Sequence, residues 1–426
     1  MAKNFDPGVY RAILRVRQAY AFDIGGFLMR FYSYMMNIGT ITMITLAGRS
    51  FLTAGLVSSA IALCTFLISP RISKLVDDRG QHRVVPVAAA ITLVGWALML
   101  ATVGTGGPDA LLFVAAVLMG FVPNPQALTR ARWTYLIRTG RLGDAAPDLR
   151  TMFSYEGVLD DIGFMFSPSI SIALASSLFP TAGLLAGGIS FAVGVTILSL
   201  SRSTEPEPGW GAPERSEGRR RSVFRTSAVV RVLFLLMLFL GAFYGIFDTA
   251  TVALAEELHD PNIASIILII ASFVSMIMGF VFGMIRLRVP QYLQLVGAGV
   301  LIGCAYGSMA LIDSAYSLFV VSTLGALFYA PFLIVCNATC ERAVPGDRLT
   351  EAITWMNAGG TCGMAFGPSL GGLIIDEWGA VASFDLGAVL AIAIPVTLAL
   401  FYRLLKRNVR DEAYEELAHV PAGKGE

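Results

Sequence analysis

The sequence has few charged residues and few of the side chains that most enzymes use for catalysis. Charged residues make up 14% of the 426-residue chain, which has 3 His and 5 Cys. It contains no H-E-x-x-H or G-x-S-x-G motif and no P-loop ending in Gly-Lys-Ser/Thr. The cysteines lie in apolar segments without zinc-site spacing, so we expect reduced core residues. These absences predict that the protein is not an enzyme, does not use ATP and holds no metal or cofactor.

Long apolar segments fill the chain instead. Hydrophobic residues make up 55% of it, and the mean hydropathy is +0.69. A helix needs about 20 apolar residues to cross roughly 30 Å of hydrocarbon. We therefore expect an all-α membrane protein with twelve transmembrane helices. The predicted spans are 22–47, 52–71, 84–104, 109–135, 151–178, 180–201, 228–254, 262–285, 291–312, 316–340, 350–375 and 381–404.

Basic residues collect in alternate gaps between these spans, with Arg30 and Arg49 as exceptions. Cytoplasmic loops of membrane proteins are rich in Lys and Arg, so the pattern predicts that both termini are cytoplasmic. We expect a multi-pass protein of the plasma (inner) membrane whose surroundings are the lipid bilayer. A nucleic-acid partner is disfavoured, because the basic residues act as topology signals in short loops. Arg49 lies just outside the first span and is explained as an interfacial residue.

A polar segment divides the spans into two sets of six. We predict an N-terminal six-helix bundle over 1–201, a cytoplasmic linker over 202–226, a C-terminal six-helix bundle over 227–405 and a cytoplasmic tail over 406–426. The linker contains the run Arg219-Arg220-Arg221. This run is either solvated or binds anionic lipid headgroups.

The two halves share a pattern of small residues around a proline, in the fifth and eleventh spans. The eleventh span has the pattern in full, and the fifth has a degraded copy. The residues are Gly363, Gly367, Pro368, Gly371 and Gly372 in one half, and Gly163, Ser167, Pro168, Ser171 and Ile172 in the other. Small residues at i, i+4 and i+8 let a neighbouring helix approach closely, and proline permits a bend. The pattern predicts helix packing and a pseudo-symmetric duplication.

The segment from Ser73 to Arg83 is similar to the loop motif G-x-L-x-D-R-x-G-R-R of the major facilitator superfamily, and matches it at Leu75, Asp77 and Gly80. Further resemblance, to an actinobacterial-type, drug or metabolite exporter-like branch, lies in Arg130-Ala131-Arg132-Trp133, in Glu156 with Asp160-Asp161, and in Glu351-Ala352. The resemblance covers most of the chain. It implies two pseudo-symmetric six-helix bundles that work by alternating access.

The resemblance also assigns a conformational latch at the cytoplasmic ends of the spans. Asp77 would face the start of the eleventh span near Glu351, with Gly80, Arg83 and Arg130 in the same group. A carboxylate at a helix N-terminus is stabilised by about 0.3–1 kcal/mol. The alternative is a solvated turn in which Gly80 is needed for its backbone conformation.

Arg30 lies inside the first span, where a charge is costly and usually marks function. Glu156 and Asp160 lie one helical turn apart in the fifth span, at depths that bracket that of Arg30. We expect a cross-span ion pair, with Asp161 pointing about 100° away. A carboxylate that lies beside a second carboxylate and an arginine can exchange protons. Arg30, Glu156, Asp160 and Asp161 are therefore candidates for proton coupling. The alternative is an ion pair that only stabilises the N-terminal half.

The resemblance places the substrate cavity mainly between the first, fourth, seventh and tenth spans. Asp248 is the acid inside the seventh span, and either recognises substrate or belongs to an outer vestibule. The cavity candidates are Tyr34, Asn37, Asn124, Gln126, Tyr244, Asp248, Tyr329, Asn337, Trp355 and Asn357. Each polar one could instead form an interhelical hydrogen bond, worth about 0.6 kcal/mol on average.

These features predict a proton-coupled secondary active transporter that exports neutral or cationic amphiphilic small molecules by antiport with protons. The alternative is a proton symporter that imports a sugar, a nucleoside or an organic acid. The expected partners are a small-molecule substrate, protons and lipid, and we expect a monomer.

Overall fold

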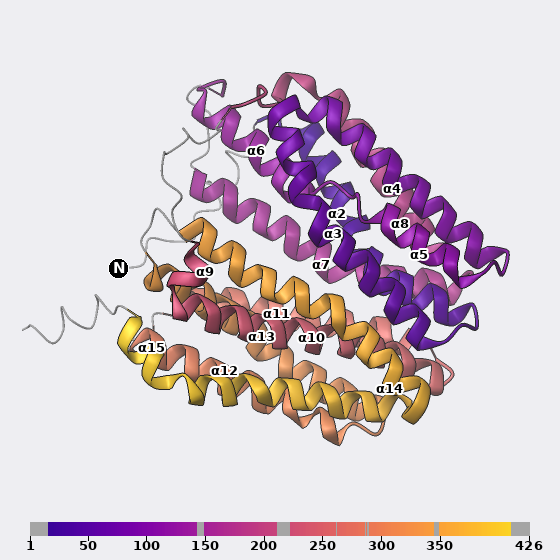
Figure 1. Cartoon of the computed structure of the whole chain (residues 1–426), viewed down its shortest axis with the longest axis vertical. Helices are drawn as coiled ribbons and strands as arrows, with labels where there is room; N and C mark the ends of the chain where they lie inside the picture. Colours follow the sequence, from indigo (N-terminus) through magenta and orange to yellow (C-terminus); the bar gives the residue numbers. More distant parts are fainter. Residues whose placement is uncertain are drawn as a thin grey trace, which may run out of the picture. The chain divides into compact units, whose positions relative to one another are not determined.

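The computed structural model of the chain describes residues 16–142, 149–210, 222–260, 262–285, 287, 289–344 and 349–409, and these residues form helices with no strand among them (Figure 1). The chain divides into two compact units, Met1–Ser216 and Glu217–Glu426. The division falls within the predicted linker 202–226. The arginine run 219–221 and the chain beyond residue 409 lie outside the described residues.

The first unit contains seven described α-helices and a short 3-10 helix. They are α2 (Tyr20–Leu46), α3 (Phe51–Arg79), α4 (Gln81–Gly104), α5 (Asp109–Met119), α6 (Pro125–Arg138), α7 (Leu149–Ser177), α8 (Ala182–Leu200) and η2 (Arg202–Thr204). In this unit α2 packs against α8, α7, α3 and α6. Gly25 and Gly194 lie where α2 meets α8, and a Cβ added to Gly25 would come within 2.9 Å of the Gly194 carbonyl oxygen. This close approach fixes α2, which carries Arg30.

The second unit has the same all-helical architecture. Its elements are α9 (Val223–Thr226), α10 (Ala228–Glu257), α11 (Asn262–Met284), α12 (Gln291–Gly307), η3 (Ser308–Leu311), α13 (Ala315–Ala343), α14 (Leu349–Leu400) and α15 (Tyr402–Asn408). α14 joins two helices at Gly379, whose φ of 84° interrupts the helical conformation. That break falls between the predicted eleventh and twelfth spans.

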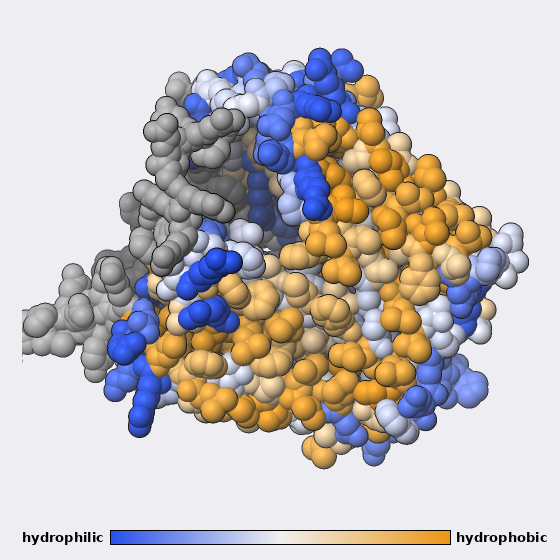
Figure 2. Space-filling model, viewed as in Figure 1, coloured by the Kyte–Doolittle hydropathy of each residue, from blue (hydrophilic) through white to orange (hydrophobic). Residues whose placement is uncertain are grey.

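Nine of the described helices are long and apolar enough to cross a membrane. Large apolar side chains are exposed on them, among them Val87, Val94 and Phe280. Figure 2 shows apolar side chains over the flanks of the helices and hydrophilic ones towards their ends. Such surfaces suit lipid, and the prediction of an all-α membrane protein is confirmed. α2 occupies the first predicted span, and α5 and α6 together occupy the fourth. The count of twelve crossings stays a prediction.

The prediction of one continuous helix over 109–135 is wrong. The structure has two helices here, and α5 ends at Met119 while α6 begins at Pro125. Pro123 and Pro125 have no backbone N–H to continue the helical hydrogen bonds. The side chain of Asn124 accepts a hydrogen bond of 3.0 Å from Ala127 N and caps α6. Asn124, a predicted cavity residue, therefore begins the second half of a broken helix.

The predicted gap between the second and third spans is almost entirely helical. α3 continues to Arg79, and α4 begins two residues later at Gln81. Gly80 joins them with φ +88°, a conformation that side chains other than glycine rarely adopt. A Cβ at Gly80 would also lie 2.8 Å from Glu205 Oε1. The backbone conformation at position 80 therefore requires glycine.

Candidate functional site

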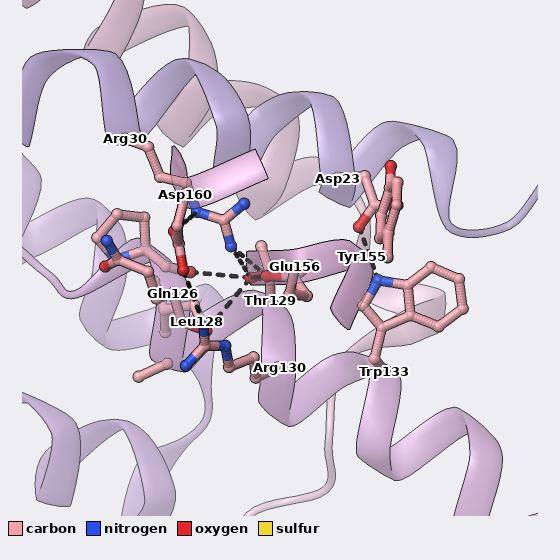
Figure 3. A network of polar contacts seen from close by, with 12 residues as sticks. Asp23, Arg30, Gln126, Leu128, Thr129, Arg130, Trp133, Tyr155, Glu156 and Asp160 are labelled. Carbon is pink, nitrogen blue, oxygen red and sulfur yellow. Dashed lines mark hydrogen bonds and ion pairs between the residues drawn. The ribbon is translucent and has the colours of Figure 1, made fainter. Parts of the chain in front are cut away.

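Arg30 of α2 lies in a buried polar cluster of the first unit, shown in Figure 3. The side chains of Arg30 and of Glu156 on α7 are both 0% exposed. Arg30 donates a charge-assisted hydrogen bond to Glu156 Oε2. Arg30 also donates to Thr129 Oγ1 of α6 over 2.7 Å. Thr129 in turn lies 2.8 Å from Glu156 Oε2 and donates to it. Three helices therefore meet around one guanidinium group.

Asp160 lies one turn beyond Glu156 on α7 and contacts two arginines. Arg30 Nε is 3.0 Å from Asp160 Oδ1, an ion-pair contact without hydrogen-bond geometry. Arg130 of α6 donates to Asp160 Oδ2 over 2.7 Å. The side chain of Asp160 is 18% exposed and that of Arg130 is 38% exposed. The cluster therefore runs from a sealed carboxylate, Glu156, to one that solvent can reach.

The charges of this cluster balance when all four groups are ionised. Arg30 and Arg130 supply two positive charges, and Glu156 and Asp160 supply two negative charges. Five buried atoms of these side chains have no hydrogen-bond partner among the described residues: Arg30 Nε and Nη1, Arg130 Nε, Glu156 Oε1 and Asp160 Oδ1. Unsatisfied buried polar atoms are costly. The cluster therefore has unused hydrogen-bonding capacity both at Glu156 and at Asp160.

The break between α5 and α6 determines how α6 presents its side chains to this cluster. Gln126, Thr129 and Arg130 follow the N-cap Asn124 within the first two turns of α6. Gln126 Nε2 donates to the hydroxyl of Tyr34 over 3.0 Å. The Tyr34 ring packs against Gly163 of α7, where a Cβ would lie 3.1 Å from it. Two predicted cavity residues, Tyr34 and Gln126, therefore lie in contact.

Asp23 is a buried acid that was not predicted as a site residue. It lies two turns before Arg30 on α2 and is 7% exposed. The indole N–H of Trp133 donates to its Oδ1 over 2.8 Å, and the hydroxyl of Tyr155 lies 3.5 Å from its Oδ2. Figure 3 draws this group beside Glu156. The sequence signal that could have revealed Asp23 was an acidic residue in the first turn of a predicted membrane helix.

Arg132 was also missed as a separate site, although it is fully buried. It donates to Gln81 Oε1 over 2.7 Å, to Thr204 Oγ1 over 3.0 Å and to the carbonyl oxygens of Leu198 and Ser201 over 3.0 and 2.5 Å. These contacts join α6 to α4, to the end of α8 and to the start of the linker. Arg132 therefore stabilises the helix ends beside the cluster.

The structure places the predicted latch residues in different surroundings. Asp77 and Arg83 are exposed at the ends of α3 and α4, and Arg130 belongs to the cluster around Asp160. Glu351 of α14 accepts hydrogen bonds of 2.8 Å from Ser222 Oγ and Val223 N within the second unit. The latch from Asp77 to the start of the eleventh span would join the two units, and it stays a prediction.

In the second unit, two of the predicted cavity residues, Tyr244 and Tyr329, lie in one aromatic group. The ring of Tyr244 is 4.8 Å from that of Tyr329, and the Tyr244 hydroxyl is 2.7 Å from that of Tyr306. Asp248 follows Tyr244 by one turn on α10. Tyr306 of α12 was missed, because nothing in the local sequence links it to α10.

The remaining predicted residues do not join these groups. Asn337 is exposed and donates to Leu333 O over 2.9 Å, while the Trp355 ring lies 4.7 Å from that of Phe224. Asn357 is exposed, and its carbonyl oxygen accepts from Thr361 over 3.3 Å. Asn37 is part-buried on α2, and its Oδ1 has no hydrogen-bond partner among the described residues. The side chain of Asp161 lies outside the described residues.

The small residues of the eleventh span lie against α10. A Cβ added to Gly363 or to Gly367 would come within 2.5 Å of backbone atoms of Ala242. Pro368 packs on Gly245, while Gly371 and Gly372 are buried. In the fifth span Pro168 lies inside α7, and Ser171 meets Gly39 and Gly183. These contacts are those of close helix packing.

This arrangement, long apolar helices in two units with a buried arginine–carboxylate cluster in one of them, defines a polytopic membrane protein of the secondary-transporter class. The sequence matches the model of the Major Facilitator Superfamily over residues 24–322 and 233–424. The chain belongs to this superfamily and is a membrane transporter.

Solved structures share its fold. The nucleoside transporter NupG is 13% identical, with a TM-score of 0.68 over 92% of this chain and 100% of that one. The POT family transporter PepTSo is 13% identical, with a TM-score of 0.67 over 92% and 98%. A bacterial homologue of the human lysosomal transporter Spinster is 14% identical, with a TM-score of 0.63 over 94% and 97%. The search of curated proteins found no match.

Proposed function

We propose that the protein is a proton-coupled secondary active transporter and that the cluster around Arg30 is its coupling site. The observation that carries this proposal is the shared ion pair of Arg30 with Glu156 and Asp160. Buried ionisable groups in a membrane protein are costly and usually functional. A cluster that only stabilised the fold would be replaceable by apolar side chains at little cost.

Asp160 is the group that exchanges the proton in this proposal. Its side chain is 18% exposed, whereas that of Glu156 is 0% exposed. When a proton bonds to Asp160, the carboxylate loses its charge and its attraction to Arg30 and Arg130. Arg30 keeps its ion pair with Glu156, so a buried arginine is not left without a counter-charge. Protonation therefore loosens the contact of α7 with α2 and α6 without breaking the whole cluster.

The substrates we propose are neutral or cationic amphiphilic small molecules, exported in exchange for protons. The support comes from the second unit, where Asp248 adjoins the aromatic group of Tyr244, Tyr306 and Tyr329. An acid beside aromatic faces suits an organic cation. The alternative is proton symport of a sugar, a nucleoside or an organic acid. A solved nucleoside transporter with the same fold is a reason to include nucleosides among the compounds tested.

The remaining parts of the proposal concern topology and assembly. We place the protein in the plasma membrane as a monomer with twelve crossings and both termini in the cytoplasm. The placement of Lys and Arg in alternate gaps supports the crossings and the cytoplasmic termini.

Reconstitution in liposomes with an imposed pH gradient tests the function. Compounds are added one at a time, and a pH-sensitive dye records proton movement. Antiport predicts that substrate and protons move in opposite directions, and symport predicts the same direction. Asp160→Asn should abolish the proton movement that a substrate induces.

The matched control is Asp109→Asn, which removes a different Asp–Arg pair of the same unit, the one with Arg49. This control should keep coupled transport. Unchanged coupling in both Asp160→Asn and Glu156→Gln would remove the cluster from the mechanism.

A further inference from the structure

Asp23 is a buried acid to which the transport proposal gives no role. It lies seven residues before Arg30, on the same face of α2 and about 10 Å away along the helix. Like Arg30, it contacts both α6 and α7, through Trp133 and Tyr155. Tyr155 directly precedes Glu156 on α7, and Figure 3 shows the two groups side by side. Asp23 therefore extends the polar cluster around Arg30 by one layer.

The hydrogen bonds of Asp23 come from neutral groups. The indole N–H of Trp133 donates to its Oδ1, and the hydroxyl of Tyr155 lies 3.5 Å from its Oδ2. Glu156 and Asp160, by contrast, each pair with at least one arginine. No cation in the described part of the chain forms an ion pair with Asp23.

The other charged groups on the helices around this end of α2 do not supply a counter-charge. Arg132 of α6 is buried, but it donates to groups of α4, α8 and the start of the linker. α8 has no charged residue. The charged residues of α3 in the range 71–79 are exposed, as are Arg17 before α2 and Arg138 at the end of α6. Among the described residues, Asp23 therefore has only the charges of the cluster itself to balance its own.

The number of charges in the extended cluster sets how many protons it holds. Two arginines, Arg30 and Arg130, face three acids, Asp23, Glu156 and Asp160. With all five groups ionised, a net negative charge would lie in a largely buried site within a membrane helix bundle, which is costly. One proton makes the cluster neutral. Because Glu156 keeps its sealed ion pair with Arg30, that proton is on Asp23 or on Asp160.

We propose that Asp23 is a second proton-binding residue, protonated while Asp160 is ionised and ionised while Asp160 carries the proton. Asp160 is the exchanging group of the transport proposal, so this role of Asp23 rests on the proposed function. In each exchange an O–H bond on one carboxyl group breaks and its proton passes to water, while water supplies the proton that bonds to the other carboxylate. Asp23 lies one turn from Tyr20, which is 43% exposed at the predicted cytoplasmic end of α2, so it exchanges its proton with the cytoplasm.

The pH dependence of transport is the first readout. In Asp23→Asn, a proton on Asp160 leaves a positive charge in the cluster without compensation, so Asp160 takes up a proton only at lower pH. For two charges about 10 Å apart, at an effective dielectric constant of about 20, the effect is about one pH unit. The pH of half-maximal transport should therefore move about one unit towards acid. Asp23→Glu keeps the charge and should restore the profile of the unaltered chain.

Infrared difference spectroscopy of the full chain in liposomes detects the proton itself. A protonated carboxyl group has a carbonyl-stretch band that a carboxylate lacks, and spectra are recorded at neutral pH. Asp23→Asn should lose intensity in this band. Asp160→Asn should lose it as well, because two arginines then face two acids and no proton is needed. Arg130→Gln should gain intensity, because a single arginine then faces three acids.

Asp109→Asn is the matched control, since Asp109 is 54% exposed and pairs with Arg49 outside the cluster. It should keep the band and the pH profile. Thermal unfolding checks the fold of each variant, and Asp23→Asn keeps an acceptor for Trp133. An unchanged band in Asp23→Asn, or an equal loss in Asp109→Asn, would overturn the role of Asp23 without touching the proposed function. Coupled transport that persists in Asp160→Asn would instead overturn the proposed function, whatever the infrared band shows.

Discussion

Arg30 Nε lies 3.0 Å from Asp160 Oδ1, while the same guanidinium group binds Glu156 through Nη2. One cation on α2 therefore serves two carboxylates on successive turns of α7. Because Arg130 holds the second oxygen of Asp160, the outer carboxylate has a partner on each side. The contact of α2 with α7 depends on the charge of these groups as well as on packing.

Replacing Arg30 alone should damage both stability and transport. Arg30→Gln leaves Glu156 buried without its cation, and removing one partner of a buried pair costs about 3–5 kcal/mol. The double variant Arg30→Gln/Glu156→Gln removes both charges and should recover most of that stability. It should not recover proton coupling. Thermal unfolding and liposome transport measure the two effects separately. Full coupling in the double variant would contradict a role for this pair in transport.

Asp23 should tolerate loss of charge better than loss of its hydrogen-bond acceptor. In Asp23→Asn the side-chain oxygen can still accept from the Trp133 indole, so the fold should stay within about 1 kcal/mol of the unaltered chain. Asp23→Leu leaves the buried N–H of Trp133 without a partner, which costs about 1–3 kcal/mol. Thermal unfolding followed by tryptophan fluorescence compares the two variants. Equal stability of Asp23→Leu and Asp23→Asn would show that the hydrogen bond contributes nothing.

The start of the linker is bound to the first unit through Glu205. Its Oε1 accepts from His82 N over 3.0 Å and lies 2.9 Å from His82 Nδ1, so it caps the beginning of α4. Glu205→Ala should destabilise the first unit by about 0.5–2 kcal/mol, the usual effect of losing a cap. Glu205→Gln keeps an acceptor and should lose less.

Thermal unfolding and limited proteolysis of the linker measure the effect of the Glu205 variants. Glu207→Ala is the control for a neighbouring acid, because Glu207 accepts from Tyr135 over 3.0 Å and has no hydrogen bond to α4 among the described residues. Greater destabilisation by Glu207→Ala than by Glu205→Ala would contradict the capping role.

Much of the contact around Arg30 could be predicted from the sequence because depth in a membrane helix follows residue number. The rise of 1.5 Å per residue places Arg30, Glu156 and Asp160 at similar depths, and lipid forces such side chains inward. The rotation of α6 about its own axis could not be predicted from the depth of its residues. It depends on the break at Pro123 and Pro125, which the apolar composition of 109–135 does not reveal.

Other contacts were missed because their partners are distant in the sequence and lack a pattern. Trp133 and Asp23 are 110 residues apart, and Glu205, in the predicted linker, is 123 residues from His82. In the second unit, the hydroxyl of Tyr306 meets that of Tyr244 across 62 residues. Such pairs follow from how helices rotate and pack, which a single sequence does not encode in local spacing.

The packing of α14 on α10 gives the sharpest test of the small-residue pattern in the eleventh span. A Cβ at Gly363 would lie 2.5 Å from Ala242 N, a backbone atom that cannot move away without shifting α10. Gly363→Ala should therefore destabilise the second unit by about 1–3 kcal/mol, as overpacking does. Gly297 of α12 is the matched control, since a Cβ there meets nothing within 4 Å.

Gly297→Ala should leave stability unchanged or raise it by up to about 1 kcal/mol, because alanine favours the helix. Thermal unfolding of the two variants in the same detergent gives the comparison. The two alanines are chemically identical, so any difference between them comes from the surroundings of each glycine. Equal stability of the two variants would mean that α10 and α14 can separate at no cost, and that the small residues do not hold them together.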